Sequence, residues 1–422
     1  MLEPNSPLRL RAFRALWLAS IFSYVGTFVE EVGHGWVMVN LTTNPMLVAA
    51  LTLAWTVPAL MLALPSGLLA DRFDRRKILV WSQALAALSA LSLAIATWLG
   101  FVSPGVILAA CVGLGMASAL ANPPWFTLIA ELVPRESTAE AVALNSIAFN
   151  LARAVGPAIG GFILGALGPV WAFSINAVSF LAVIYALETY PEFRAAAEAP
   201  RERRPSESIV TALLAPFAQL RKSQRLAAPF IAIALFSLPA SCAVSLLPAF
   251  AKHSLNTSAR GFGALLAALG IGAIAGGLVL KRARAWLGPR VLVGASFALY
   301  GLGIFAMAFA PNVTVAFFCL LPAGVGWVTL SVLNATVQLA SPSWIKSRTM
   351  ALYQMSFLVA WSIGATVGGV IARLTNERLA IAFGGLGVVC MSAAIARLKL
   401  PNRDADLVAQ PIGTPLPTAA SN

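Results

Sequence analysis

Charged residues are scarce in this sequence. They make up 11% of its 422 residues, whereas 59% are hydrophobic; soluble domains carry about 25% charged residues. A soluble core does not grow with chain length in a way that buries so much apolar surface. Apolar runs long enough to cross a bilayer recur along the chain. The composition therefore excludes a soluble enzyme and indicates a protein that crosses the membrane many times.

Cysteine and histidine are also rare, which limits the possible chemistry. The four cysteines all fall inside apolar runs without C-x-x-C spacing, so neither disulfides nor a metal site are predicted. The two histidines, His34 and His253, are far apart in the sequence and suggest no nucleophile–base set. The G-x-x-x-x-G-K-[ST] loop of ATP-driven pumps is absent. We therefore expect no enzymatic activity, no metal and no cofactor, and a proton gradient as the energy source.

The apolar runs predict twelve membrane-spanning helices. In lipid only helices and closed barrels satisfy the backbone, and these runs lack the ten-residue alternation of barrel strands. The predicted spans cover residues 13–39, 45–70, 78–99, 105–132, 141–167, 170–190, 228–251, 261–280, 291–310, 313–340, 349–372 and 379–396. The fold class is thus an all-α membrane protein. No cleavable signal peptide is expected, because the first apolar run is too long and too polar for one.

The basic residues predict the orientation of the chain. Of the 29 Lys and Arg residues, 24 fall at the N-terminus, in alternate loops, in the central linker or after the last span. Loops on the cytoplasmic side carry such an excess, so both termini are predicted to be cytoplasmic. The formal net charge of +13 is then explained by topology. A nucleic-acid partner is unnecessary, and the expected location is the cell (inner) membrane.

A polar segment near the middle divides the chain. We predict four regions: a six-helix bundle (1–190), a cytoplasmic linker (191–227), a second six-helix bundle (228–400) and a disordered cytoplasmic tail (401–422). Four apolar linker residues share one helical face: Ile209, Leu213, Phe217 and Leu220. They favour an amphipathic helix on the inner membrane surface. Because Pro216 interrupts the pattern, an ordinary linker is the alternative.

An internal repeat supports two related halves. The segment 155–161, V-G-P-A-I-G-G, matches 363–369, I-G-A-T-V-G-G, at an offset of 208 residues. The same offset aligns Pro134 with Pro342. A weaker match sets Gly67-Leu68 against Gly277-Leu278, each pair just before a basic loop. Two homologous halves related along the membrane normal are typical of transporters.

The loop after the second span carries the most specific motif. Residues 67–77, G-L-L-A-D-R-F-D-R-R-K, closely resemble the signature G-x-x-x-D-R-x-G-R-R of the major facilitator superfamily. The resemblance covers about residues 1–400 and implies that fold: two pseudo-symmetric six-helix bundles. It also implies a cytoplasmic gate formed by Gly67, Asp71, Arg72, Arg75 and Arg76. Asp74 stands where the general pattern has Gly, a form that resembles the bacterial enterobactin-exporter and drug-efflux branch.

The fifth span contains a second motif. Gly156, Pro157, Gly160 and Gly161 resemble the G-P-x-x-G-G antiporter motif of proton-coupled exporters in this superfamily. Small residues at this spacing let helices approach closely, and proline bends a helix. Packing without coupling is the alternative interpretation. The R-x-x-x-G pattern of drug exporters is missing from the fourth span, which leaves proton coupling less well supported than export.

Only two acidic residues lie well inside a span, Glu30 and Glu31. A charge at that depth costs about 2.5–3.5 kcal/mol, so two together need a reason. Glu30 and His34 share a helical face, and the two carboxylates point about 100° apart. We hypothesise that Glu30 or Glu31 binds the transported proton or a cationic substrate group, with His34 adjusting its proton affinity. A water-filled external mouth is the alternative.

Arg153 is the only basic residue near the centre of a span, one turn before the antiporter motif. It is expected to line the cavity, where it pairs with an acid or binds an anionic substrate; a static ion pair or a snorkelling side chain is the alternative. The remaining polar candidates, which could equally be hydrogen-bonding contacts between helices, are Asn150, Asn334, Gln338, Tyr353 and Gln354, with Trp327 and Trp361 as aromatic walls.

These features together predict a secondary transporter. The motifs favour proton-coupled efflux of a small amphipathic drug, siderophore or metabolite by alternating access. Lysophospholipid flipping and nutrient uptake are alternatives, and a non-transporting sensor is a remote one. The expected partners are a small-molecule substrate and the lipid bilayer, with the protein acting as a monomer.

Overall fold

The computed structural model describes residues 6–198, 217, 219–221, 223–327, 329–341, 346–395 and 398. Within these ranges the chain is helical and contains no strand, which confirms the predicted all-α fold class. Twelve helical segments are long and apolar enough to cross a membrane. The predicted amphipathic linker helix lies almost entirely outside the described residues, and the tail over 401–422 lies wholly outside them.

The helices of the first half are α1 (Arg11–Leu41), α2 (Pro45–Arg72), α3 (Arg75–Trp98), α4 (Pro104–Leu132), α5 (Thr138–Ala166), α6 (Pro169–Thr189) and the short α7 (Glu192–Glu198). Those of the second half are α9 (Gln224–Ser245), α10 (Leu247–Ala249), α11 (Ala259–Ala308), α12 (Val313–Trp327), α13 (Thr329–Ala340), α14 (Lys346–Leu374) and α15 (Glu377–Ile395). A π-helical turn, Phe250–Ser254, follows α10. Two predicted spans, 261–280 and 291–310, are joined in α11 through Gly288, whose φ of 70° breaks the helix.

Local sequence signals determine where several helices begin. Proline occupies the first turn of α2, α4 and α6. Backbone N–H groups in the first turn have no partner within the helix, so the missing N–H of proline costs no hydrogen bond there. Asn44 caps α2 by accepting a bond from the Met46 N–H at 3.0 Å. Asp74 caps α3 in the same way, accepting from the N–H groups of Arg76 and Lys77. The Asp74 cap fixes the start of α3 at the basic loop that follows α2.

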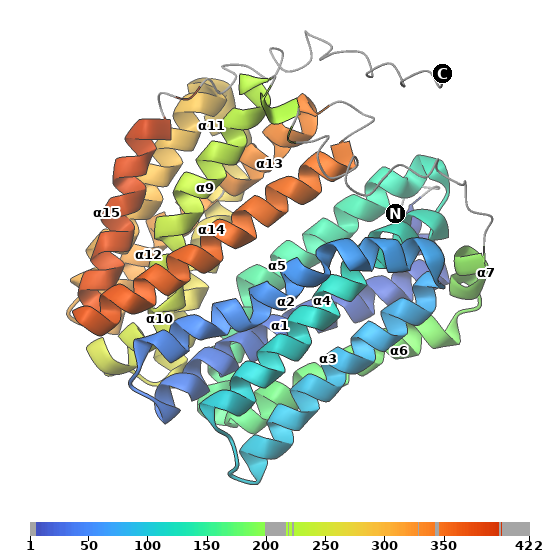
Figure 1. The fold of residues 1–422 in the computed structure, drawn as a ribbon, viewed down its shortest axis with the longest axis horizontal. Coiled ribbons are helices and arrows are strands. Elements are labelled where there is room, and N and C mark those ends of the chain that lie inside the picture. The colour runs from blue at the N-terminus through green and yellow to red at the C-terminus, as the bar shows by residue number, and fades with distance from the viewer. Residues whose placement is uncertain are drawn as a thin grey trace, which may run out of the picture.

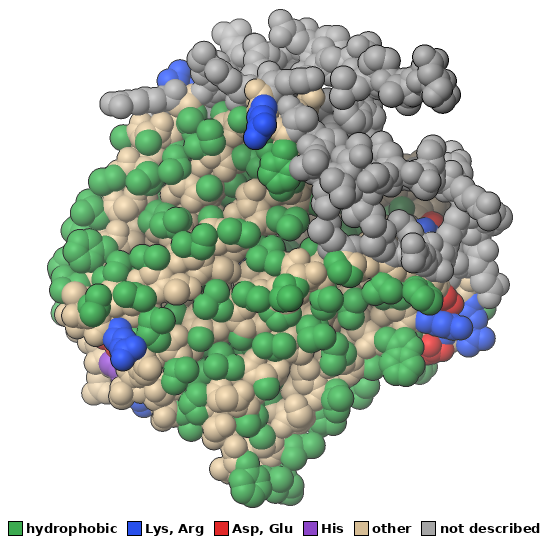
Figure 2. All heavy atoms as spheres, in the orientation of Figure 1, with side chains coloured by type: hydrophobic (Ala, Val, Ile, Leu, Met, Phe, Trp, Pro, Cys, Tyr) green, Lys and Arg blue, Asp and Glu red, His purple; other side chains and the backbone are tan. Residues whose placement is uncertain are grey.

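The outer surface of the helices matches a bilayer. Hydrophobic side chains cover the face drawn in Figure 2 over both halves, and charged side chains are confined to its margins. Trp81, in the second turn of α3, and Trp98, its last residue, are 75% and 74% exposed. They are separated by about 26 Å along the helix, close to the hydrocarbon thickness of about 30 Å. Tryptophan concentrates at both membrane interfaces, so α3 spans the bilayer between these two residues.

The two halves are in contact mainly along two helix pairs, α5 with α11 and α2 with α14. Glycine allows the backbones to meet: a Cβ on Gly161 would lie 2.3 Å from the Gly263 Cα, and one on Gly369 would lie 2.9 Å from the Ala49 Cβ. We call the end of the helices that holds the N-terminus and the α2–α3 loop the basic end. In Figure 1 the two halves come together at the opposite end and lie farther apart at the basic end.

Candidate functional site

Adjacent carboxylates on α1 face different environments. Glu30 is buried, with 1% of its surface exposed, whereas Glu31 is exposed. Successive residues on a helix point about 100° apart, so neighbours cannot share a face. Glu30 faces α4 and α6 inside the first half, and Glu31 faces α5, where it interacts electrostatically with Arg153. The structure therefore separates two residues that the sequence treats as equivalent.

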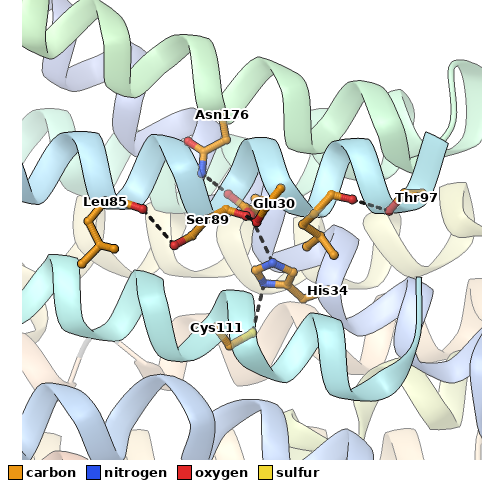
Figure 3. A network of polar contacts seen from close by, with 9 residues as sticks. Glu30, His34, Leu85, Ser89, Thr97, Cys111 and Asn176 are labelled. Carbon is orange, nitrogen blue, oxygen red and sulfur yellow. Dashed lines mark hydrogen bonds and ion pairs between the residues drawn. The ribbon is translucent and has the colours of Figure 1, made fainter. Parts of the chain in front are cut away.

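Glu30 belongs to a buried hydrogen-bond network, called the Glu30 network from here on. Its members are Glu30 and His34 on α1, Cys111 on α4, and Asn176 and Ser179 on α6. His34 Nε2 lies 3.1 Å from Glu30 Oε1, and His34 Nδ1 lies 3.6 Å from the sulfur of Cys111. The amide nitrogen of Asn176 donates to Glu30 Oε2 (Figure 3). All three helices belong to the first half, so this network does not join the halves.

Three network members were not predicted from the sequence: Cys111, Asn176 and Ser179. Asn176 and Ser179 stand three residues apart in the otherwise apolar sixth span, so both lie on one face of α6. Polar residues at this spacing inside a span suggest a polar partner on a neighbouring helix. That signal was present in the sequence, but it does not identify Glu30 as the partner.

Arg153 joins the two halves at the middle of the membrane. Its guanidinium carbon lies 4.8 Å from the ring centroid of Trp327, which ends α12 in the second half. It also interacts electrostatically with Glu31 and with Tyr300. A guanidinium over an indole face is held by a cation–π attraction of about 2 kcal/mol or more when desolvated. Arg153 is thus placed between an acid of its own half and an aromatic ring of the other half.

Aromatic side chains surround Trp327 on the second-half side. Trp361 stands edge-on to it at 5.7 Å, and Tyr300 packs against it at 5.8 Å. Phe236 lies 5.0 Å from Tyr300 and 4.4 Å from Phe297. The Tyr300 hydroxyl is buried and has no hydrogen-bond partner within the described part of the chain. The predicted aromatic walls, Trp327 and Trp361, therefore pack against a buried aromatic cluster that contains the phenol of Tyr300.

The glycines of the antiporter-like motif bring three helices together. A Cβ on Gly156 would lie 2.6 Å from the Phe28 Cβ, and one on Gly160 would lie 3.0 Å from the Val29 Cα, both on α1. Gly161 faces Gly263 of the other half instead. Pro157 lies inside α5 between these contacts. The motif thus seats α1, which carries Glu31, against α5, which carries Arg153, and holds both against the second half.

Contact between the halves along α5 ends close to Arg153. Gly165 meets Arg260, Gly161 meets Gly263, and the Ala154 carbonyl lies 2.4 Å from where a Cβ of Gly270 would be. One turn closer to the basic end, Asn150 is exposed, and its amide donates to the Ser146 carbonyl of its own helix. The halves therefore touch from the far end to the level of Arg153 and separate beyond it.

The polar candidates of the second half lie on the separated side. Gln338 and Gln354 are exposed, and Gln338 donates to the Asn334 side chain at 2.6 Å. Gln338 on α13 and Gln354 on α14 each lie in the part of the helix that is nearer the basic end. The structure thus brings Glu31, Arg153 and Trp327 together. The other three candidates, Asn150, Gln338 and Gln354, are exposed nearer the basic end.

Among the described side chains of the predicted cytoplasmic gate, Arg75 and Arg76 form ion pairs within the first half. Arg75 pairs with Glu131 at the end of α4. Arg76 pairs with Glu188 and donates to the Leu187 carbonyl at 2.8 Å, at the end of α6. A Cβ on Gly67 would meet no atom within 4 Å. The side chains of Asp71 and Arg72 lie outside the described ones. In this conformation Arg75 and Arg76 tie α3 to α4 and α6.

Substituting Asp74 tests its role as a helix cap. Because its carboxylate accepts two N–H groups of α3, we expect Asp74→Ala to lower the free energy of unfolding by about 1 kcal/mol. Asp74→Asn keeps an acceptor and should change it little, and Asp74→Gly should cost only a few tenths of a kcal/mol. Thermal unfolding in detergent measures the difference. Equal stability of the Ala and Asn variants would show that the cap contributes nothing.

Comparison with known proteins places this architecture among transporters. The family described as transmembrane secretion effector matches residues 2–419. The chain is 27% identical over 388 residues to the enterobactin exporter EntS of Salmonella choleraesuis (strain SC-B67), covering 90% of each protein. It is 24% identical over 304 residues to the staphyloferrin A transporter of Staphylococcus aureus (strain NCTC 8325 / PS 47), covering 72% of this chain and 75% of that one.

Solved structures show the same fold at low sequence identity. A bacterial homologue of the iron transporter ferroportin in an inward-facing state superposes with a TM-score of 0.70 at 16% identity, covering 92% of this chain and 98% of that one. A bacterial homologue of the human lysosomal transporter Spinster superposes with a TM-score of 0.67 at 15% identity, covering 94% of this chain and 97% of that one. These likenesses establish the helix arrangement.

Proposed function

This chain belongs to the transmembrane secretion effector family of the major facilitator superfamily, and from that premise we propose that it exports a siderophore-like molecule in exchange for protons. Its relatives include proteins named for enterobactin export and staphyloferrin A transport. The chain is accordingly a multi-pass membrane transporter of the efflux type for a small molecule. The proton coupling, the substrate class and the residues involved are the proposal.

The basic end supplies the orientation of the proposed cycle. Arg75, Arg76, Arg194 and most other basic residues lie at this end, which the positive-inside rule assigns to the cytoplasm. We therefore place both termini in the cytoplasm and the protein in the cell (inner) membrane, acting as a monomer. The halves are joined at the opposite end and separated at the basic end. On this orientation the structure is an inward-facing state, ready to take substrate from the cytoplasm.

The observation that carries the proposal is the placement of Glu31 and Arg153. They are opposite charges at membrane depth, on two helices of the first half, and Arg153 also holds Trp327 of the second half. A charge at this depth costs about 2.5–3.5 kcal/mol unless it is balanced. Protonation of Glu31 removes the charge that balances Arg153. Proton binding at one residue thereby changes the energy of a contact that exists between the halves.

This arrangement couples protonation to conformation by simple linkage. Any ligand that changes the energy of one conformation relative to the other shifts their equilibrium by that difference. When Glu31 is ionised, Arg153 is balanced and stays on Trp327, which favours the inward-facing state. When Glu31 is protonated, Arg153 is left as an uncompensated cation, and the contact is weakened. The balance between the two conformations then depends on the protonation state of Glu31.

Transport in proteoliposomes tests the proposal. The purified protein is placed in vesicles with an acidic interior, which represents the external side of the cell membrane. We expect enterobactin or staphyloferrin A to accumulate several-fold over protein-free vesicles, and a protonophore to abolish the accumulation. Accumulation that persists after the pH gradient is collapsed would contradict proton coupling. Movement of a fluorescent lysophospholipid in place of both siderophores would instead favour the flippase alternative, and accumulation under the opposite gradient would favour uptake.

A further inference from the structure

The Glu30 network is closed off from the interface where transport is proposed to occur. Glu30 is 1% exposed, His34 7%, Cys111 3% and Asn176 0%. The ring of His34 stacks on Phe173 of α6 at 5.6 Å and 26°. Among the described residues, every side chain hydrogen-bonded to this set belongs to the first half. The network is therefore a separate site from Glu31 and Arg153, although both sites share α1.

Hydrogen-bond directions assign charges within the network. The Asn176 amide nitrogen can only donate, and it is directed at Glu30 Oε2. That oxygen consequently carries no proton. The remaining oxygen, Oε1, faces His34 Nε2 at 3.1 Å. With a proton on His34 Nε2, Glu30 accepts on both oxygens, which is the bonding pattern of an ionised carboxylate.

A buried carboxylate needs a balancing charge, and His34 supplies it. An unpaired ion inside a protein costs several kcal/mol. Imidazolium donates from both nitrogens: Nε2–H to Glu30, and Nδ1–H to the sulfur of Cys111. The pair then has no net charge and no unused N–H group. A second proton would leave a buried positive charge, so the pair has no capacity for a proton that is taken up and released in each cycle.

The titratable groups around His34 agree with this assignment. On α1 they are Glu30 and, more weakly, Glu31; on α4 the group is Cys111; α6 contributes the uncharged Phe173, Asn176 and Ser179. Among the described residues that bond to it, the carboxylate of Glu30 has His34 as its sole basic partner. Removal of either member would leave the other buried without its counter-ion, which favours its neutral form.

The same contacts fix the rotation of α1. A Cβ on Gly26 would lie 2.6 Å from Asn176 Oδ1, and one on Gly33 would lie 2.7 Å from the Phe173 ring. Helices α1 and α6 are therefore packed at backbone distance on both sides of the Glu30–His34 pair. With this face held against α6 and α4, the next residue along the helix, Glu31, is turned about 100° away and towards Arg153.

We propose that Glu30 and His34 form a permanently charged, mutually neutralising pair that positions α1, and that this pair is not the carrier of the transported proton. The second clause rests on the proposed proton coupling; the first does not. Both residues are positioning residues, because they act through the orientation that they impose on Glu31.

Histidine nuclear magnetic resonance tests the charge assignment without any transport assay. The chain has only two histidines, and His253 is a surface residue paired with Glu377, so His253→Gln leaves His34 as the single signal. In nanodiscs, ¹⁵N-histidine spectra should show both ring nitrogens protonated and unchanged from about pH 5.5 to 8.5. Glu30→Gln should convert this signal to neutral or titrating imidazole, whereas Glu31→Gln should leave it protonated.

Each contrary spectrum overturns the proposal. A neutral or titrating His34 in the His253→Gln protein would show that the pair exchanges its proton, and an unchanged signal in Glu30→Gln would show that Glu30 is not its counter-ion.

A transport experiment uses the double variant Glu30→Gln/His34→Gln, which removes both charges together. Enterobactin accumulation should slow in this variant, because Glu31 is less well oriented, but it should keep its pH dependence; a pH-independent rate would make the pair the proton carrier. Loss of coupling in the unmodified protein, with the expected spectra, would overturn the proposed function alone.

Discussion

Glu31→Gln is expected to abolish accumulation driven by a pH gradient while substrate exchange across the vesicle membrane continues. The amide keeps the shape of the carboxylate but cannot bind or release a proton. Arg153 is then never balanced by ionised Glu31, and the contact with Trp327 no longer depends on pH. We expect the gradient-driven rate to fall by about tenfold or more, since a coupling energy of 1–3 kcal/mol corresponds to about 5–150-fold.

Matched variants separate this effect from general damage. Glu188→Gln removes an acid at the basic end that pairs with Arg76 and Arg194, and it should leave gradient-driven transport near that of the unmodified protein. Arg153→Met removes the partner charge and should reduce both driven transport and exchange, because it also loses the contact with Trp327. Full pH-driven activity in Glu31→Gln would disprove the proposed role of this residue.

The sequence was sufficient to predict the twelve spans and the family, because those depend on long apolar runs and on loop motifs. The sequence could not show which of Glu30 and Glu31 faces Arg153 and which is buried inside the first half. Their difference is one of helix rotation, and rotation is set by contacts with other helices: Asn176 and Phe173 on α6 and Cys111 on α4. Neither neighbour is visible in the local pattern around residue 30, so the pairing needed the three-dimensional structure.

The basic loop shows a different limit. Its motif identified the family, and the family implies a gate between the halves. In the structure Arg75 and Arg76 have acidic partners in their own half, Glu131 and Glu188. In Figure 1 the ribbons of the two halves diverge towards this end. A sequence motif is shared by all conformations of a transporter, whereas a structure shows the contacts of one.

The internal repeat, by contrast, acquires a physical meaning. Gly364 and Gly368 meet Leu238 and Cys242 on α9, the first span of the second half, as Gly156 and Gly160 meet α1. The third glycine of each set crosses to the other half: Gly161 meets Gly263, and Gly369 meets Ala49 and Met46. Each half thus uses two glycines to seat its own first span and one to contact its partner. Sequence identity at an offset of 208 residues reflects this shared packing.

Gly161→Val is therefore expected to destabilise the inward-facing state and to reduce transport by about tenfold or more. The valine Cβ would lie 2.3 Å from the Gly263 Cα and 3.2 Å from the Ala259 carbonyl oxygen. These are backbone atoms, so the steric clash can be relieved only if α5 and α11 move apart. Overpacking of this kind costs about 1–3 kcal/mol, and applied to one conformation it shifts a two-state equilibrium by about 5–150-fold.

The shift can be measured as a distance as well as a rate. Spin labels on cysteines substituted for Glu136 and Arg282, both exposed near the basic end, in a background without the native cysteines, report how far the halves are separated there. Weakening the contact at the far end should favour the opposite conformation, so the distance between the labels should shorten in Gly161→Val. Gly294→Val is the matched control, because its added Cβ has no neighbour closer than 3.8 Å. Unchanged transport and an unchanged distance in Gly161→Val would show that the glycine crossing does not hold the inward-facing state.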